Sequence, residues 1–357
     1  MDSFKVSALK YRPKNFNEVI GQEIITSTLQ NAIDSNQLPQ ALLFCGPRGV
    51  GKTSCARILA KAINDKTNTS PNQDYSFNIF ELDAASNNGV EEIRRLNEQV
   101  RIPPQIGDFK IYIIDEVHML SLPAFNAFLK TLEEPPKHAI FILATTEKNK
   151  IIPTILSRCQ IYNFKRISIQ QIKDSLVRIC AHKNVKYDDD SLVLIAKKAD
   201  GAMRDALSLF DRMVSFTSGN LFINDVRKDL SVLSIDIYIT ILGLIQKNKI
   251  PDILLTVDEV INDGYEPISL IHGLANHVRM LLLSKDSSTI SLSEVSLISQ
   301  EKYIKQSKVF NYNWLIEALS IIKDSELSHK LSLNKRLNSE LCLMKLASLH
   351  FNGEKKN

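Results

Sequence analysis

The chain has 357 residues, of which 44% are hydrophobic and 24% charged, the ordinary balance of a globular protein. This balance argues against long disorder or a fibrous structure, and the length suggests two or three domains. A formal net charge of +4 at pH 7 is too small to indicate nucleic acid as a partner by itself.

The apolar stretches and the cysteines indicate the cellular compartment of the protein. The longest apolar stretches, such as residues 139–144, are far shorter than the roughly 20 residues that a membrane-spanning helix needs. The N-terminus lacks the pattern of a secretory signal. Five scattered cysteines without a Cys-x-x-Cys pair favour reduced thiols over disulfides or a structural zinc site. We therefore expect a cytoplasmic protein without membrane contact.

Short apolar runs alternate with amphipathic stretches over the first 165 residues. The apolar runs predict buried strands at 41–45, 78–84, 110–115 and 139–146, and the amphipathic stretches predict helices at 52–63, 90–100 and 123–133. This alternation predicts an α/β domain with a parallel sheet covered by helices on both faces.

The pattern changes near residue 166, because apolar residues then recur at helical spacing and no convincing strand appears. We divide the chain into an α/β domain at 1–165, a small helical domain at 166–227 and a larger helical domain at 228–352.

A glycine-rich motif directly follows the first predicted strand. It reads Gly46-Pro47-Arg48-Gly49-Val50-Gly51-Lys52-Thr53, fits G-x-x-x-x-G-K-T, and leads at Ser54 into a predicted helix. Such a loop turns its backbone N–H groups toward phosphate oxygens, and the helix N-terminus adds partial positive charge. We expect Lys52 to reach the β- and γ-phosphates and the Thr53 hydroxyl to bind Mg²⁺.

The third predicted strand ends in two carboxylates, Asp115 and Glu116. The carboxyl ends of parallel strands share one edge of a sheet, so this pair should lie near the phosphate loop. Asp115 would hold Mg²⁺ through its water shell, and Glu116 would polarise the attacking water. Two merely solvated carboxylates are the alternative, but beside an intact phosphate loop the pair indicates a nucleoside triphosphatase.

Long stretches of the chain resemble the bacterial clamp-loader motor subunits, the gamma/tau family of DNA polymerase III. These stretches are residues 8–23, 46–62, 83–94, 111–136, 141–164 and 201–211, with a thinner likeness at 334–349. The resemblance implies an AAA+ domain, a helical lid and an α-helical collar, with ATP and Mg²⁺ as cofactors. It also implies other clamp-loader subunits, a sliding clamp, primer-template DNA and the DNA polymerase III holoenzyme as partners. It implies ATPase activity without a polymerase active site.

The resemblance also assigns roles around the nucleotide. One of Thr145 and Thr146, with a preference for Thr146, would be the sensor that touches the γ-phosphate or the attacking water. The alternative is a threonine that simply completes a strand end. Tyr11 and Arg12, together with residues 19–22, resemble the segment that packs around the adenine, although a hydrophobic strap at the start of the domain would look similar.

Two arginines receive roles in the same way. Arg158, in Ser157-Arg158-Cys159, matches the arginine that reaches the nucleotide of a neighbouring subunit, and the alternative is an ion pair with a local carboxylate. Arg204 matches the second sensor, which touches the γ-phosphate from the lid. For Arg204 the alternative is a surface ion pair with Asp205 or Asp200.

The chain departs from the family pattern in two respects. The family usually carries a four-cysteine zinc knuckle, whereas residues 64–77 contain no cysteine, so we expect no zinc. In length the chain also resembles the short, motor-only form, so we do not expect these residues to tether the polymerase through a long tail. DNA contacts, implied for residues 87–95, would be made to phosphates without reading base sequence, and a solvated charged face is the alternative.

Two other functions compete with a clamp-loader motor. One is another oligomeric DNA motor, such as a branch-migration helicase, against which a helical third domain argues. The other is a non-hydrolysing structural subunit of the same loader, against which the intact set Lys52, Thr53, Asp115 and Glu116 argues.

Overall fold

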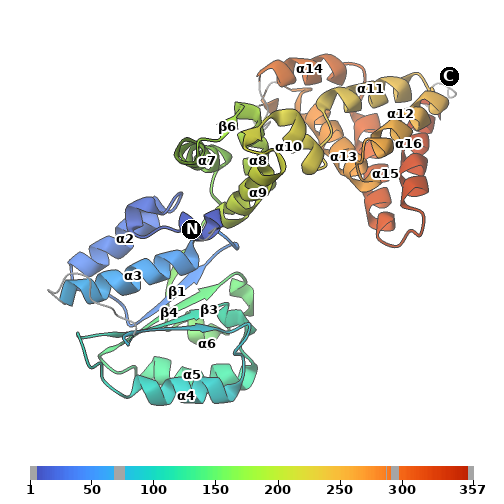
Figure 1. Ribbon diagram of the computed structural model, residues 1–357. Helices are drawn as coiled ribbons and strands as arrows, with labels where there is room; N and C mark the ends of the chain where they lie inside the picture. The colour runs from blue at the N-terminus through green and yellow to red at the C-terminus, as the bar shows by residue number, and fades with distance from the viewer. Residues whose placement is uncertain (1–5, 68–76, 287, 291–296, 353–357) are drawn as a thin grey trace. The chain divides into compact units, whose positions relative to one another are not determined.

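The computed structural model describes residues 6–67, 77–286, 288–290 and 297–352. The chain divides into two compact units, residues 1–221 and 222–357 (Figure 1). The three predicted domains stay a prediction, and their second boundary falls inside helix α10 (Ile223–Asp229).

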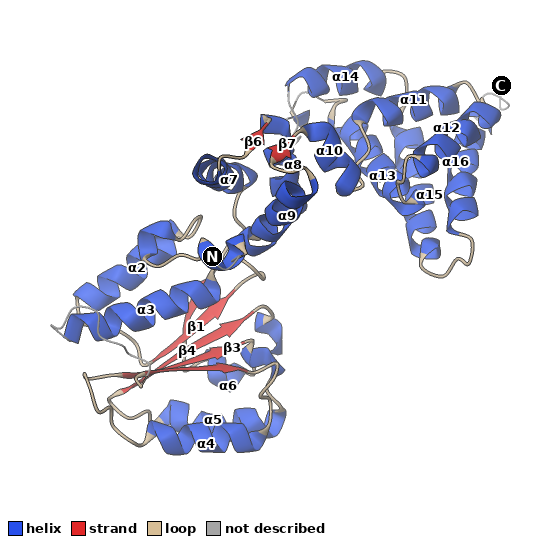
Figure 2. Cartoon of the chain, in the orientation of Figure 1, coloured by secondary structure: helices blue, strands red, loops and turns tan. Residues whose placement is uncertain are grey.

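A parallel five-stranded sheet forms the centre of the first unit (Figure 2). The strands, which pair in the order β2-β3-β4-β1-β5, are β1 (Ala41–Cys45), β2 (Ile79–Asp83), β3 (Lys110–Asp115), β4 (Ala139–Thr145) and β5 (Gln160–Asn163). The α/β prediction is confirmed, but the sequence does not predict β5. This edge strand has polar ends and buries only Tyr162, so it leaves no apolar run to recognise.

The side chains of each central strand alternate between two hydrophobic layers. In β1, Leu42 and Phe44 pack with α2 (Glu23–Asp34) and α3 (Lys52–Thr67). Leu43 and Cys45 pack instead with α4 (Val90–Val100) and α5 (Leu122–Glu133). Figure 1 shows the two helix pairs on opposite faces of the sheet. Burial on both faces explains why β1 is apolar throughout.

Three helices and a small sheet complete the first unit. The helices are α7 (Ile169–Lys183), α8 (Asp189–Lys198) and α9 (Met203–Phe216). A capping box between Ser168 and Gln171 starts α7, and the Asp188 side chain caps α8. Two short parallel strands, β6 (Lys186–Tyr187) and β7 (Asn220–Leu221), correct the expectation of no strand after residue 165. Two residues are too few to show a strand period.

Short elements link these larger ones in the first unit. They are α1 (Ser7–Lys10), α6 (Pro153–Leu156) and the 3₁₀ turns η1 (Phe16–Glu18), η2 (Val117–Met119) and η3 (Lys148–Lys150).

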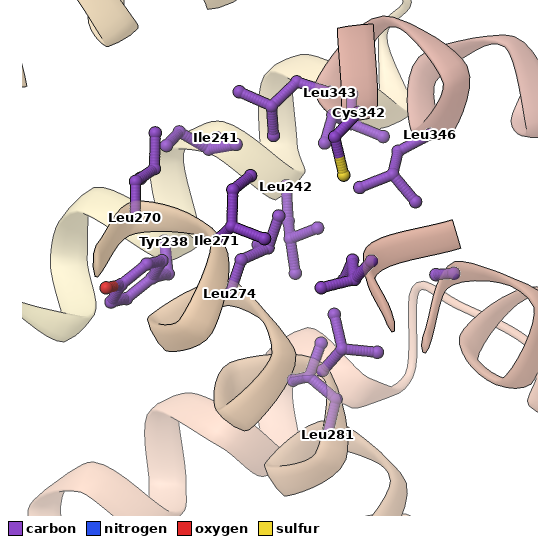
Figure 3. Close-up of a cluster of buried hydrophobic side chains, with 14 of the residues drawn as sticks. Tyr238, Ile241, Leu242, Leu270, Ile271, Leu274, Leu281, Cys342, Leu343 and Leu346 are labelled. Atoms are coloured by element: carbon purple, nitrogen blue, oxygen red, sulfur yellow. The ribbon is translucent and has the colours of Figure 1, made fainter. Parts of the chain in front are cut away.

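The described part of the second unit is helical, as the periodicity predicts. Its helices after α10 are α11 (Ile235–Gln246), α12 (Ile250–Asn262), α13 (Pro267–Leu283), α14 (Leu297–Ser307), α15 (Tyr312–His329) and α16 (Lys335–Asn352). Figure 3 shows Leu242 of α11, Ile271 of α13 and Leu343 of α16 in one apolar cluster. Truncating such a fully buried side chain to alanine costs about 2–5 kcal/mol. Within the described ranges, no helix is long and apolar enough to span a membrane.

Candidate functional site

The phosphate loop, residues 46–53, connects the end of β1 to the first turn of α3 at the carboxyl edge of the sheet. Gly46 has φ +151°, and a Cβ there would lie 2.5 Å from the carbonyl oxygen of Phe164. Gly49 has φ +74°, and its Cβ would lie 3.0 Å from the Cβ of Ala202. Close backbone approach at Gly46 and the left-handed conformation at Gly49 therefore require glycine.

Lys52 is the first residue of α3, and its side chain is held inside the phosphate loop. The residue is 6% exposed, and Nζ donates to the carbonyl oxygens of Gly46 at 2.8 Å and Pro47 at 2.7 Å. Burial lowers the pKa of Lys52, and the carboxylates of Glu116 and Asp115 act in the opposite direction. The ammonium group is thus positioned within the loop that a phosphate would enter.

Thr53 and Asp115 meet across the sheet edge. The Thr53 hydroxyl donates to Asp115 Oδ2 at 2.7 Å, which joins the first turn of α3 to the end of β3. Hydroxyl and carboxylate oxygens are the ligand types that Mg²⁺ prefers. The donor set therefore fits the predicted magnesium site. Over the described ranges, no three or more His, Cys, Asp and Glu side chains cluster as a metal site. The loop 64–77, which we expect to lack zinc, lies largely outside the described residues.

Glu116 and Thr146 also come together at this edge. Thr146 donates to Glu116 Oε2 from its hydroxyl at 3.0 Å and from its backbone N–H at 3.3 Å. Thr145 is fully buried, and its hydroxyl instead lies 3.1 Å from Nδ1 of His118. The geometry is consistent with the preference for Thr146 as the sensor, and the assignment stays a prediction. Sequence reasoning did not single out His118, whose position depends on a turn after β3.

Arg158 lies at the opposite edge of the sheet. It comes just before β5, and its partner Glu133 ends α5, ahead of β4. Nη2 donates to Glu133 Oε1 at 2.7 Å, and Nη1 donates to the carbonyl of Thr154 at 2.9 Å. All five strands are parallel, so the residue before β5 and the loop after β1 lie at opposite edges. The alternative role for Arg158, a local ion pair, is therefore present in the contact with Glu133. The Arg158 guanidinium lies away from Lys52 of the same chain.

The first turn of α9 approaches the phosphate loop. The backbone nitrogen of Arg204 lies 3.4 Å from the carbonyl oxygen of Gly49, and a Cβ on Gly49 would lie 3.4 Å from the Arg204 Cβ. The predicted second sensor is therefore next to the loop. This closeness links the position of α9 to the loop conformation.

The N-terminal segment reaches both α3 and α7. Arg12 donates from Nε to Ser54 Oγ at 3.1 Å, and the Tyr11 hydroxyl lies 3.0 Å from Nδ1 of His182. Burial lowers the pKa of Arg12, and the positive charge of Arg57 lowers it further. The structure therefore places Arg12 against the helix that follows the phosphate loop. The predicted contacts of Tyr11 and Arg12 with adenine stay a prediction.

Two further features lie near the start of α2. The buried amide of Gln22 donates to the carbonyl of Lys165 at 2.7 Å and accepts from the Lys165 N–H at 3.1 Å, which ties α2 to the start of the lid. Sequence reasoning missed this clamp, because its two residues are far apart in the chain. Val19 and Ile20, near Gln22, line a hollow of about 600 Å³ between α2 and α7.

The predicted DNA-facing helix is present as α4. Its Arg94 and Arg95 are exposed and pair with Glu91 and Glu92 of the same helix at 2.6 and 3.2 Å. These short-range pairs are of the kind that stabilises a helix surface by a few tenths of a kcal/mol.

The fold and the site define a protein of the AAA+ ATPase class, with a phosphate loop, a hydroxyl–carboxylate pair of the ligand types that Mg²⁺ prefers, and a helical lid. A family model described as "DNA polymerase III, delta subunit" matches residues 21–168. Another, "DNA polymerase III clamp loader subunit, ATPase lid domain", matches residues 171–219. The RuvB branch migration motor of Thermotoga maritima has the same fold, with a TM-score of 0.50 at 21% identity over 66% of this chain and 79% of that chain.

Relatives over most of the chain identify the family. The tau subunit of DNA polymerase III from Bacillus subtilis is 40% identical over 354 residues, which cover 94% of this chain and 62% of the relative. The gamma subunit from Buchnera aphidicola is 34% identical over 364 residues, 98% of both chains. The chain belongs to the gamma/tau family of DNA polymerase III subunits. It spans about half, 49%, of the Escherichia coli tau subunit, to which it is 36% identical.

Proposed function

We propose that this chain is the ATP-hydrolysing motor subunit of the DNA polymerase III clamp loader, which loads the sliding clamp onto primed DNA. The observation that carries the proposal is the complete set of Lys52, Thr53, Asp115 and Glu116 at one edge of the sheet. A structural subunit that does not hydrolyse ATP would not need this set. The names of the relatives support DNA polymerase III as the setting, and the matching lid-domain model supports the clamp loader within it.

Each residue of the set would have a distinct task. Lys52 and the N-terminus of α3 would neutralise phosphate charge in the bound nucleotide. Thr53 and Asp115 would hold Mg²⁺, which supplies charge neutralisation at the phosphate oxygens when bound. Glu116 would orient and polarise the attacking water, with Thr146 beside it. Arg204 would bring the lid into contact with the γ-phosphate.

Arg158 would act on the nucleotide of a neighbouring subunit. Its position at the far edge of the sheet supports this role, because its own phosphate loop lies at the opposite edge. An arginine supplied in this way is worth about 10³- to 10⁵-fold in rate in other triphosphatases. The ion pair with Glu133 is partly exposed, with 34% of the Arg158 side chain accessible. Breaking this pair so that Arg158 can contact a phosphate therefore costs little free energy.

The partners would be the other clamp-loader subunits, the sliding clamp, the polymerase III holoenzyme and primer-template DNA in the cytoplasm. DNA would be bound through its phosphates along α4, so the affinity should fall steeply with salt and depend little on sequence.

An ATPase assay on the assembled loader tests the proposal. We expect primer-template DNA and the sliding clamp, added together, to raise the hydrolysis rate. A rate that changes with neither addition, in a complex that binds ATP, would contradict the clamp-loader function.

A further inference from the structure

A histidine with a largely buried side chain lies next to the proposed hydrolytic carboxylate. His118 belongs to η2, which follows Glu116, and its side chain is 6% exposed. Its Nδ1 lies 3.4 Å from Glu116 Oε2 and 3.1 Å from the Thr145 hydroxyl oxygen. Its Nε2 lies 3.4 Å from Glu147 Oε1. The imidazole therefore sits between two carboxylates, one in the site and one on the loop after β4.

The contacts around Glu116 restrict its carboxylate to one orientation. The backbone of Glu116 is left-handed, with φ 47° and ψ 44°, and its N–H donates to Asp115 Oδ1 at 2.9 Å. A non-glycine residue in this region costs about 1–2 kcal/mol, and such a conformation persists where its surroundings over-determine it. Thr146 and His118 both face Oε2, which leaves Oε1 as the oxygen that can face a water.

The outer side of the imidazole faces a surface loop. The Glu147 N–H donates to the Thr145 hydroxyl at 3.0 Å, and Lys150 Nζ donates to Glu147 Oε1 at 2.8 Å. The hydrogen bond from Lys150 lowers the pKa of Glu147, so this carboxylate is charged at neutral pH. Glu147 Oε1 near Nε2 and the Thr145 hydroxyl near Nδ1 together fix the plane of the ring.

We propose that His118 is a positioning residue for the Glu116 carboxylate, and that Glu147 is its outer support. The inference rests on the proposed ATP hydrolysis and adds to it a residue that does not touch the nucleotide. Thr146 contacts Oε2 through its hydroxyl and N–H, and the imidazole of His118 adds a second contact to the same oxygen. Without the ring, Glu116 can rotate away from the water, and a misplacement of about 1 Å at a reacting group costs about 10²-fold in rate.

Two amide substitutions separate the inner contact from the outer one. The amide of His118→Asn occupies the place of Nδ1, next to Glu116, whereas the amide of His118→Gln reaches toward the place of Nε2, next to Glu147. We expect His118→Asn to keep most of the kcat for ATP hydrolysis by the assembled complex. His118→Gln and His118→Ala should lower kcat by about 10- to 100-fold, with KM for ATP within about twofold of the unaltered value.

Glu147 is exposed, so it can be substituted without disturbing the core. Glu147→Gln should lower kcat by about two- to fivefold at unchanged KM, since it removes the charge that orients the ring. Lys148→Ala, an exposed change in the same loop, is the matched control and should leave kcat unaltered. Thermal unfolding of each variant shows whether the fold is retained.

The ranking of the variants decides the inference. Equal kcat for the Asn and Gln variants, or a loss in ATP affinity in place of kcat, would overturn the positioning role. So would a kcat for Glu147→Gln equal to that of Lys148→Ala. Binding of a fluorescent ATP analogue and turnover by the unaltered complex are measured alongside. If the unaltered complex neither binds the analogue nor turns over ATP, the proposed function itself is wrong. This outcome differs from a failure of the positioning role alone.

Discussion

Replacing Gly201 by alanine should destabilise the lid far more than the same change at a matched glycine. Gly201 precedes α9 and has φ +79°, and a Cβ there would lie 2.6 Å from the Cβ and 3.2 Å from the Cα of Arg166. Gly219, in the same lid, has φ +87° and no heavy atom within 4 Å of its Cβ position. The two sites share the backbone strain and differ in the steric conflict.

The structure sets the size of the difference. A left-handed backbone costs an alanine about 1–2 kcal/mol at either site. Overpacking adds about 1–3 kcal/mol at Gly201, because the atoms in conflict belong to the backbone end of Arg166 and cannot swing aside. We expect a loss of about 2–5 kcal/mol for Gly201→Ala and about 1–2 kcal/mol for Gly219→Ala. A shifted α9 would also displace Arg204, so ATP-dependent lid closure should weaken in the Gly201 variant alone.

Urea unfolding of the full chain, followed by circular dichroism, measures the two losses as shifts in midpoint at a common m-value. Binding of a fluorescent ATP analogue is the functional readout. Equal midpoints for the two variants would refute the steric reasoning. A larger loss at Gly219 would refute the strain argument as well.

The remaining predictions concern the nucleotide, the interface and the thiols. Lys52→Ala should abolish nucleotide binding, whereas Glu116→Gln should keep ATP bound without turning it over; equal affinity of Lys52→Ala and the unaltered chain would refute the assignment. Arg158→Ala should leave ATP binding by the isolated chain intact, and mixing it with Lys52→Ala chains should restore some hydrolysis; no recovery in verified mixed oligomers would argue against a role across the interface. Elemental analysis after dialysis should find no stoichiometric zinc, and one zinc per chain would contradict the loop expectation. Because burial raises the pKa of Cys55 to about 12 and all five cysteines are buried, a thiol reagent should react slowly with the native chain and fully in urea; fast labelling of the native chain would contradict this.

Local sequence patterns determined the elements that carry the site. Strand β1 and the central residues of β3 and β4 form apolar runs because both of their faces are buried, and that signal needs no knowledge of pairing. The phosphate loop is contiguous, so the residues that turn its backbone are adjacent in the chain and visible as a motif. The type of chemistry at residues 46–53 and at Asp115–Glu116 could therefore be predicted from residue order.

The tertiary structure decided which separate segments meet. Thr53 reaches Asp115 because parallel strands bring the ends of β1 and β3 to one edge, and because the order β2-β3-β4-β1-β5 leaves only β4 between them. Strand order is a long-range property that local spacing does not encode. Parallel pairing likewise places Arg158, which precedes β5, at the opposite edge. The placement of His118 between Glu116 and Glu147 needs a left-handed turn and a neighbouring strand end together. Contacts of this kind depend on packing between segments, whereas a motif is formed by residues that are neighbours along the chain.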